Sequence, residues 1–200
     1  YAPGGNYSTY FGNYWNVPSW SYPMGMLYSN KQVKQCINSQ LQAEEFGIEF
    51  WMVAYQMQSS SDEYLIYSTN NSNITQSKYG GMSIGFKTYN GTNLYPFIEY
   101  DAFGEIIRLD GSNSSLVKSV PVWNWTKIRL YKTNEMKGDL EVMRWKLWIG
   151  NELCIDHTDT TYKTFNQEQG SNNFIKIAGE NKGGSRRFSG YLYDFKVYNI

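Results

Sequence analysis

The segment that most constrains this chain is residues 188–199, which read Phe-Ser-Gly-Tyr-Leu-Tyr-Asp-Phe-Lys-Val-Tyr-Asn. Leu192, Phe195, Val197 and Tyr198 surround one charged pair, a composition typical of a strand with one buried and one solvated face. The backbone groups of such a strand need partners on both sides. We therefore expect this segment to lie inside a sheet, paired with a segment from near the beginning of the chain, which makes the domain closed and self-contained.

Strand signals recur from residue 46 onward at the spacing of a sandwich. The predicted strands cover residues 46–55, 64–68, 82–87, 95–101, 105–109, 125–132, 140–149, 153–156 and 174–179. Gly150-Asn151 predicts a tight type II′ hairpin turn, and Phe50 and Trp145 are predicted core residues. Helical periodicity is nearly absent. The sequence therefore predicts an all-β fold, an antiparallel two-sheet jelly-roll sandwich.

Four segments, in the expected order, resemble the laminin-G-like branch of the concanavalin A-like lectin and glucanase superfamily. They are Phe46–Val53, Val122–Arg129, Leu147–Leu153 and Phe188–Asn199. The resemblance implies a jelly roll that recognises glycans or glycoproteins. The chain departs from the family at Tyr193, where an acidic residue is usual, and at Gly150-Asn151, where the family has Asn-Gly.

Residues 1–30 differ in composition from the rest of the chain. They are rich in Gly, Pro, Asn, Ser and aromatic residues without a clear period, and this predicts an irregular aromatic N-terminal arm before a single jelly-roll domain at 31–200. A short helical turn is expected near residues 40–45. So many aromatic side chains would not stay in water, so the arm either covers its own sheet or contacts another molecule.

The charge balance excludes some partners. Eighteen Lys and Arg offset eighteen Asp and Glu without a basic run, so we expect no nucleic acid partner, and no apolar run is long enough for membrane insertion. The chain begins at Tyr1 without a leader, as a processed or excised piece would.

The sequence contains six N-glycosylation sequons, at Asn6, Asn70, Asn73, Asn90, Asn113 and Asn124. They predict an extracellular or cell-surface glycoprotein of the secretory pathway. The alternative is that these segments are unmodified Asn-rich loops.

The two cysteines, Cys36 and Cys154, are too few for a disulfide scaffold or a zinc site. They either form one disulfide that closes a long loop or remain two buried free thiols.

Catalytic chemistry is poorly supported. A retaining glucanase needs carboxylates in phase on one strand, but after Glu99 and Asp101 the next acid, Glu105, follows a turn. The single histidine, His157, is expected in a surface loop. We therefore predict no catalytic residues, no metal and no cofactor, although Asp156 and Asp159 leave open a calcium ion at the rim.

Alternation places several aromatic and charged side chains on outward strand positions. The predicted ligand-binding residues are Trp125, Arg129, Tyr131, Arg144 and Trp148. Aromatic rings can stack on the C–H face of a sugar while charged groups bind its hydroxyls, unless the arm or loops cover this face. The leading hypothesis is a non-catalytic module that binds glycans or glycoproteins. The alternatives are a structural building block that contacts neighbouring subunits and, more remotely, a glycoside hydrolase.

Overall fold

The structure, a computed structural model, describes residues 9–11, 26–28, 45–55, 63–68, 81–89, 92–112, 115–116, 118–166, 175–177, 188 and 190–200. These residues form strands and turns and contain no helix, and every strand pairing is antiparallel. The described part therefore also has no helix that could cross a membrane.

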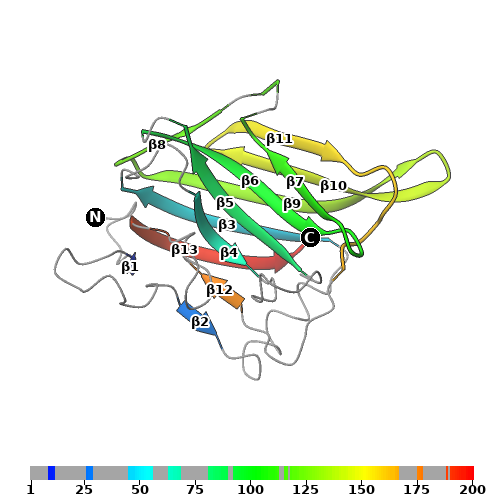
Figure 1. Cartoon of the computed structure of the whole chain (residues 1–200), viewed down its shortest axis with the longest axis horizontal. Helices are drawn as coiled ribbons and strands as arrows, with labels where there is room; N and C mark the ends of the chain where they lie inside the picture. Colours follow the sequence, from blue (N-terminus) through cyan, green and yellow to red (C-terminus); the bar gives the residue numbers. More distant parts are fainter. Residues whose placement is uncertain are drawn as a thin grey trace.

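The strands form two sheets. In spatial order, the six-stranded sheet contains β1 (Thr9–Phe11), β13 (Gly190–Asn199), β3 (Phe46–Ala54), β9 (Thr126–Lys137), β10 (Leu140–Ile149) and β11 (Glu152–Thr158). The seven-stranded sheet contains β2 (Met26–Tyr28), β12 (Ile175–Ile177), β4 (Glu63–Ser68), β5 (Met82–Thr88), β6 (Asn93–Asp101) and β7 (Ile106–Asp110), with β8 (Val120–Pro121) paired to β6. Figure 1 shows the sheets stacked as two layers, which confirms the predicted jelly-roll sandwich.

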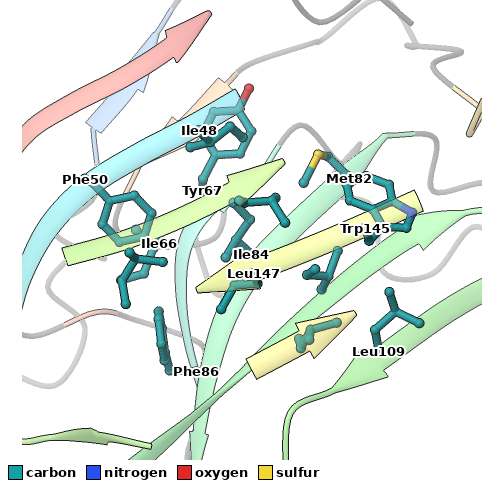
Figure 2. Close-up of a cluster of buried hydrophobic side chains, with 14 of the residues drawn as sticks. Ile48, Phe50, Ile66, Tyr67, Met82, Ile84, Phe86, Leu109, Trp145 and Leu147 are labelled. Atoms are coloured by element: carbon teal, nitrogen blue, oxygen red, sulfur yellow. The ribbon is translucent and has the colours of Figure 1, made fainter. Parts of the chain in front are cut away.

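The core lies between the two layers and is built by alternation along the strands (Figure 2). Phe50 from β3 and Trp145 from β10 are 1% and 0% exposed, which confirms their predicted burial. Tyr100 stacks on Trp145 with ring centroids 5.2 Å apart. Burying side chains of this size contributes roughly 1.5 to 3 kcal/mol each, so the alternating pattern is the main source of stability.

Strand β13 lies between β1 and β3, as predicted for residues 188–199. Leu192 is 4% exposed and Phe195 and Val197 pack against the same core, so the inward positions change from even to odd along the strand. Such a change requires one extra residue, and the register shifts between Tyr193 and Lys196. Asp194, with φ of 52°, is the positive-φ residue of this bulge.

The Gly150-Asn151 turn joins Ile149 to Glu152, and Gly150 has a φ of 60°, as the predicted type II′ turn requires. β9 is longer than predicted and continues to Lys137, because every residue of β10 pairs with a residue of β9. The turn end of the β9–β10 hairpin projects from the sandwich (Figure 1).

The predicted irregular arm contributes two short strands, which sequence analysis did not predict. β1 pairs with β13 and β2 pairs with β12, so each extends one sheet at its edge. The rest of residues 1–30 and residues 40–44 of the expected helical turn lie outside the described residues. The division of the chain at residues 30 and 31 stays a prediction.

Candidate functional site: the outer face of the six-stranded sheet

The surface of the six-stranded sheet that faces away from the core carries a compact set of aromatic and charged side chains. On β9, Ile128 and Leu130 are buried in the core, so Arg129 and Tyr131 point to the opposite face. Register then places Glu49 of β3 and Trp148 of β10 on either side of Arg129. We call Glu49, Arg129, Tyr131, Trp148 and Tyr198 the outer-face cluster.

Glu49 is the centre of this cluster. Its carboxylate accepts hydrogen bonds from Tyr131 Oη at 2.9 Å and Tyr198 Oη at 2.6 Å, and Lys127 Nζ lies 2.9 Å away. Burial alone would raise the pKa of Glu49, but the hydrogen bonds from Tyr198, Lys127 and Tyr131 outweigh it and lower the pKa to about 2. Glu49 is therefore a fixed negative charge, and it orients the two tyrosine rings.

Arg129 supplies hydrogen-bond donors beside the rings. Its Nη2 donates to the Gly150 carbonyl at 2.7 Å, and its guanidinium lies 5.7 Å from the centre of the Trp148 ring. The Trp148 and Tyr131 rings are 5.1 Å apart. Arg129 Nε is buried and has no hydrogen-bond partner within the described structure, which is uncommon for a donor on a guanidinium.

The structure brings together three of the five predicted ligand-binding residues: Arg129, Tyr131 and Trp148. Arg144 lies on the same face but is held by Asp156 on β11 and Glu135 on β9, at 2.9 and 2.7 Å. Hydrogen bonds to Asp156 and Glu135 raise the pKa of Arg144 above its usual value. Arg144 therefore belongs to a separate ion-pair network. Trp125, the fifth predicted residue, precedes β9 and is half-buried.

The opposite sheet has its own network on its outer face. Arg108 lies 3.9 Å from the centre of the Phe97 ring and pairs with Glu99 at 3.0 Å and Glu63 at 2.9 Å. The Phe97 ring in turn covers Gly85 of β5. The stack lets one arginine reach across the sheet from β7 to β4, so Glu99 is committed to an internal ion pair.

The other acids considered for hydrolysis do not assemble around Glu99. Asp101 is 2% exposed and accepts hydrogen bonds from Gly104 N at 2.7 Å and Asn166 Nδ2 at 3.0 Å. Glu105 is exposed in the turn before β7, rather than on the predicted strand. Within the described part of the chain, Glu99, Asp101 and Glu105 therefore do not form a set of three carboxylates arranged for glycoside hydrolysis.

The expectation that His157 lies in a surface loop was wrong. His157 is half-buried in β11 opposite Trp145, and burial lowers its pKa. Asp159 accepts hydrogen bonds from Tyr100 Oη and the Thr161 amide, each at 2.8 Å, while Asp156 binds Arg144. Both acids considered for a rim calcium ion thus have internal partners, and no group of three metal-binding side chains occurs among the described residues.

The two predicted covalent features are only partly described. Cys154 is buried and its Sγ lies 3.5 Å from the Lys118 carbonyl, whereas Cys36 lies outside the described residues. The disulfide therefore stays a prediction. Asn124 is exposed. The sequons at Asn6, Asn70, Asn73, Asn90 and Asn113 lie outside the described residues.

The sequence matches no family model and no curated protein. Solved structures give the informative comparisons. The CBM40 module of the Ruminococcus gnavus IT-sialidase, bound to α2,6-sialyllactose, has a TM-score of 0.52 and 14% identity over 89% of this chain and 87% of that chain. This chain shares its two-sheet jelly-roll fold with that module.

Two further structures share this jelly-roll fold. Botulinum neurotoxin type C, whose cell entry depends on two ganglioside molecules, gives a TM-score of 0.50 and 15% identity over 96% of this chain and 42% of that chain. The enzymatically active domain of bacteriophage CBA120 tailspike protein 2 gives 0.53 and 13% over 96% and 27%. The chain therefore spans less than half of these two proteins. At such identities the likeness establishes the fold alone.

The jelly roll also displays aromatic residues that sequence analysis did not select. Trp123 is 60% exposed, has a φ of 67° and stacks on Tyr55 with ring centroids 4.5 Å apart. Tyr191 of β13 meets the edge of Tyr55 at 6.0 Å. We call Tyr55, Trp123 and Tyr191 the end shelf. The sequence feature that could have indicated the end shelf is the position of Trp123 and Asn124 between two predicted strands. Alternation cannot assign an aromatic residue in such a segment to the core.

Proposed function

We propose that this protein is a recognition module that binds glycans or glycoproteins through the outer-face cluster. The observation that carries the proposal is the arrangement of the Trp148 and Tyr131 rings beside the Arg129 guanidinium on the outer face of the sheet. The two adjacent, mutually tilted rings offer an apolar surface to a sugar. The Arg129 donors can bind its hydroxyl or carboxyl oxygens, and the Glu49 carboxylate can accept hydrogen bonds from its hydroxyl groups.

The acids on the other sheet support binding over hydrolysis. Glu99 is held by Arg108 and Asp101 by internal hydrogen bonds, so neither is placed for the acid and nucleophile roles of a glycosidase. The solved structures that share the fold suggest the first probes. Because one holds sialyllactose and another depends on gangliosides, acidic and neutral forms of one oligosaccharide should be compared.

The proposal includes the laminin-G-like branch and a place in the secretory pathway. The exposed amide of Asn124 in an Asn-Trp-Thr sequon supports this, because a glycan there would meet no buried surface. Protein from its natural source should lose mass on enzymatic removal of N-glycans. An unchanged mass would contradict the secretory assignment and leave the binding proposal standing.

The binding test compares α2,6-sialyllactose with lactose by calorimetry on the whole chain. We expect Trp148→Ala to weaken binding at least tenfold with little change in melting temperature, since the ring is on the solvent side of the sheet. Tyr89→Ala is the matched control, because Tyr89 is 48% exposed at the end of β5 on the other sheet. A glycan array extends the panel if both sugars fail. Absence of binding on the array, or equal effects of the two variants, would overturn the proposal.

A second candidate is a structural role in an assembly of subunits. Met136 and Leu140, 65% and 53% exposed, place apolar surface on the projecting β9–β10 hairpin (Figure 1). Exposed apolar side chains on a projecting element are typical of protein contacts. Measurement of mass in solution tests this role. An assembly that Met136→Ser and Leu140→Ser dissociate would favour it.

The remote alternative is hydrolysis, which the same protein tests. Release of sugar from a polysaccharide that disappears in Glu99→Gln would replace binding by a glycosidase activity.

A further inference from the structure

We infer that the end shelf is a second sugar-binding site, separate from the outer-face cluster, which takes the apolar C–H face of a neutral pyranose on the indole of Trp123. This site does not depend on the function proposed above for the outer-face cluster.

The first argument is the display of the Trp123 ring. Tyr55 covers one face of the indole at a centroid distance of 4.5 Å and an interplanar angle of 27°, yet Trp123 remains 60% exposed. The exposed area is therefore largely on the other face and the edge. An indole fixed from behind and open in front is a preorganised stacking surface, because little side-chain entropy remains to be lost when a ligand binds.

The second argument is the backbone conformation. A φ of 67° is left-handed, and a bulky residue there is strained, whereas Gly or Asn would form the same turn more easily. Two hydrogen bonds hold the strained segment: Trp123 N donates to the Ala54 carbonyl at 2.9 Å, and Val122 N donates to the Thr92 carbonyl at 3.1 Å. Strain that the surroundings enforce in this way is concentrated at functional sites.

Phe103 is a useful comparison because it shares these properties. It is 56% exposed with a φ of 58°, and its ring contacts Tyr162 at 5.2 Å. However, Phe103 is a central residue of the tight turn between β6 and β7, which is closed by the hydrogen bond from Ala102 N to the Glu105 carbonyl at 2.7 Å, and such a turn requires a positive φ. No hairpin imposes the conformation on Trp123.

The chemistry of the end shelf indicates a neutral ligand. The shelf consists of three aromatic side chains, and the next residue, Asn124, adds an exposed amide. When Asn124 carries no glycan, its Nδ2 has a single weak contact, 3.5 Å from the Val122 carbonyl, so the unmodified amide can bind hydroxyl groups. These four residues are three rings and an amide and none of them is charged, a composition that suits a neutral sugar better than a carboxylate or phosphate.

The end shelf is too far from the outer-face cluster to be the same site. Tyr55, just past the end of β3, follows Glu49 by six residues, which corresponds to about 20 Å at 3.3 Å per residue. A row of three paired residues lies between them: Tyr193 on β13, Trp51 on β3 and Lys127 on β9. A monosaccharide cannot bridge this distance, so the two sites can be tested separately.

The experiment uses the whole chain, labelled with nitrogen-15 and produced without glycosylation so that Asn124 is unmodified. The indole N–H resonance of Trp123 is identified by its absence from Trp123→Gly. Methyl glycosides of glucose, galactose and mannose are then titrated. We expect at least one to shift the Trp123 resonance with an affinity of about millimolar, the strength available to so small a ligand. Trp148→Ala should leave this shift unchanged.

Trp123→Gly separates binding from folding. Glycine relieves the positive φ while removing the ring, so we expect sugar binding to disappear and the melting temperature to stay equal or rise. Phe103→Gly is the matched control, with the same backbone relief and loss of an exposed ring, and it should retain sugar binding. A Trp123 resonance that none of the three glycosides shifts would overturn the inference. So would a marked fall in the melting temperature of Trp123→Gly, because the ring would then serve the fold.

Discussion

At the scale of single residues, Glu49 shows how a carboxylate stays charged in a mostly buried position. Three donors from β9 and β13 surround it, and Gly47 makes the arrangement possible. A Cβ atom at residue 47 would lie 2.6 Å from the Tyr198 ring, so any side chain there would displace the ring that donates to Glu49. The glycine and the acid two residues later therefore act as one unit.

This arrangement predicts a dependence of stability on pH. The folded pKa of Glu49, about 2, is below its ordinary value of 4.5, so its contribution is present above the unfolded pKa and is lost as pH falls toward 2. We expect Glu49 to account for a loss of up to about 3 kcal/mol of unfolding free energy between roughly pH 5 and pH 2. Urea denaturation across this range should give a flatter profile for Glu49→Gln.

Glu152→Gln is the control for this measurement. The Glu152 side chain is 62% exposed in its ion pair with Lys118, so the substitution should leave the slope of unfolding free energy against pH the same as in the wild type. Parallel profiles for wild type and Glu49→Gln would contradict the assigned role of Glu49.

At the scale of elements, alternation in the sequence predicted the long strands well. β3, β10 and β13 each carry an apolar face, and a residue on such a strand has only two possible orientations. β1, β2 and β8 are two or three residues long and have no pattern of their own, since they form only against a partner strand. The end of β9 was missed for a related reason, because Thr133-Asn134-Glu135 is polar on both faces.

The candidate site could be predicted only in part. Alternation placed Arg129, Tyr131 and Trp148 on one face, but Glu49 and Tyr198 join them through pairings between strands that are distant in sequence. The ion pairs that hold Arg144 depend on the register of β10 and β11, which contains a bulge. Trp123 lies in a turn, where alternation gives no orientation.

Replacing glycine by alanine should lower the unfolding free energy by different amounts at Gly85 and at Gly104. At Gly85 in β5, a Cβ atom would overlap the Phe97 ring and lie 2.5 Å from the Tyr64 carbonyl, whereas at Gly104 nothing lies within 4 Å but φ is 117°. We expect Gly85→Ala to cost about 3 kcal/mol through overpacking and Gly104→Ala about 1 kcal/mol through backbone strain. Thermal unfolding of both variants measures the difference. Equal costs would mean that β5 and β6 can separate without penalty.

At the scale of the whole molecule, β13 completes the six-stranded sheet from within. It supplies Leu192, Phe195 and Val197 to the core and separates β1 from β3. Leu192 is buried and contributes roughly 1.5 to 3 kcal/mol, and the partly buried Phe195 and Val197 each contribute less, so together the three residues supply a large share of the net stability of a domain.

Deletion of residues 190–200 should therefore abolish cooperative unfolding, as followed by near-ultraviolet circular dichroism. Deletion of Ile200 alone is the control, because this residue is 56% exposed beyond the end of β13. A truncated chain that still melts in a single sharp transition would show that β1 or another segment can replace β13.

The position of β13 also affects how the protein is made. The Tyr198–Glu49 hydrogen bond joins residues separated by 149 positions, so β3 leaves the ribosome long before its neighbour on that side exists. At about 5 to 20 residues per second, the delay is roughly 7 to 30 s. During this time the apolar strand β3 has an unpaired edge on the β13 side, and its other edge is also unpaired until β9 is made, so it is a template for pairing with other nascent chains. Production of this protein should therefore depend on chaperones that bind β3 until residues 190–199 emerge.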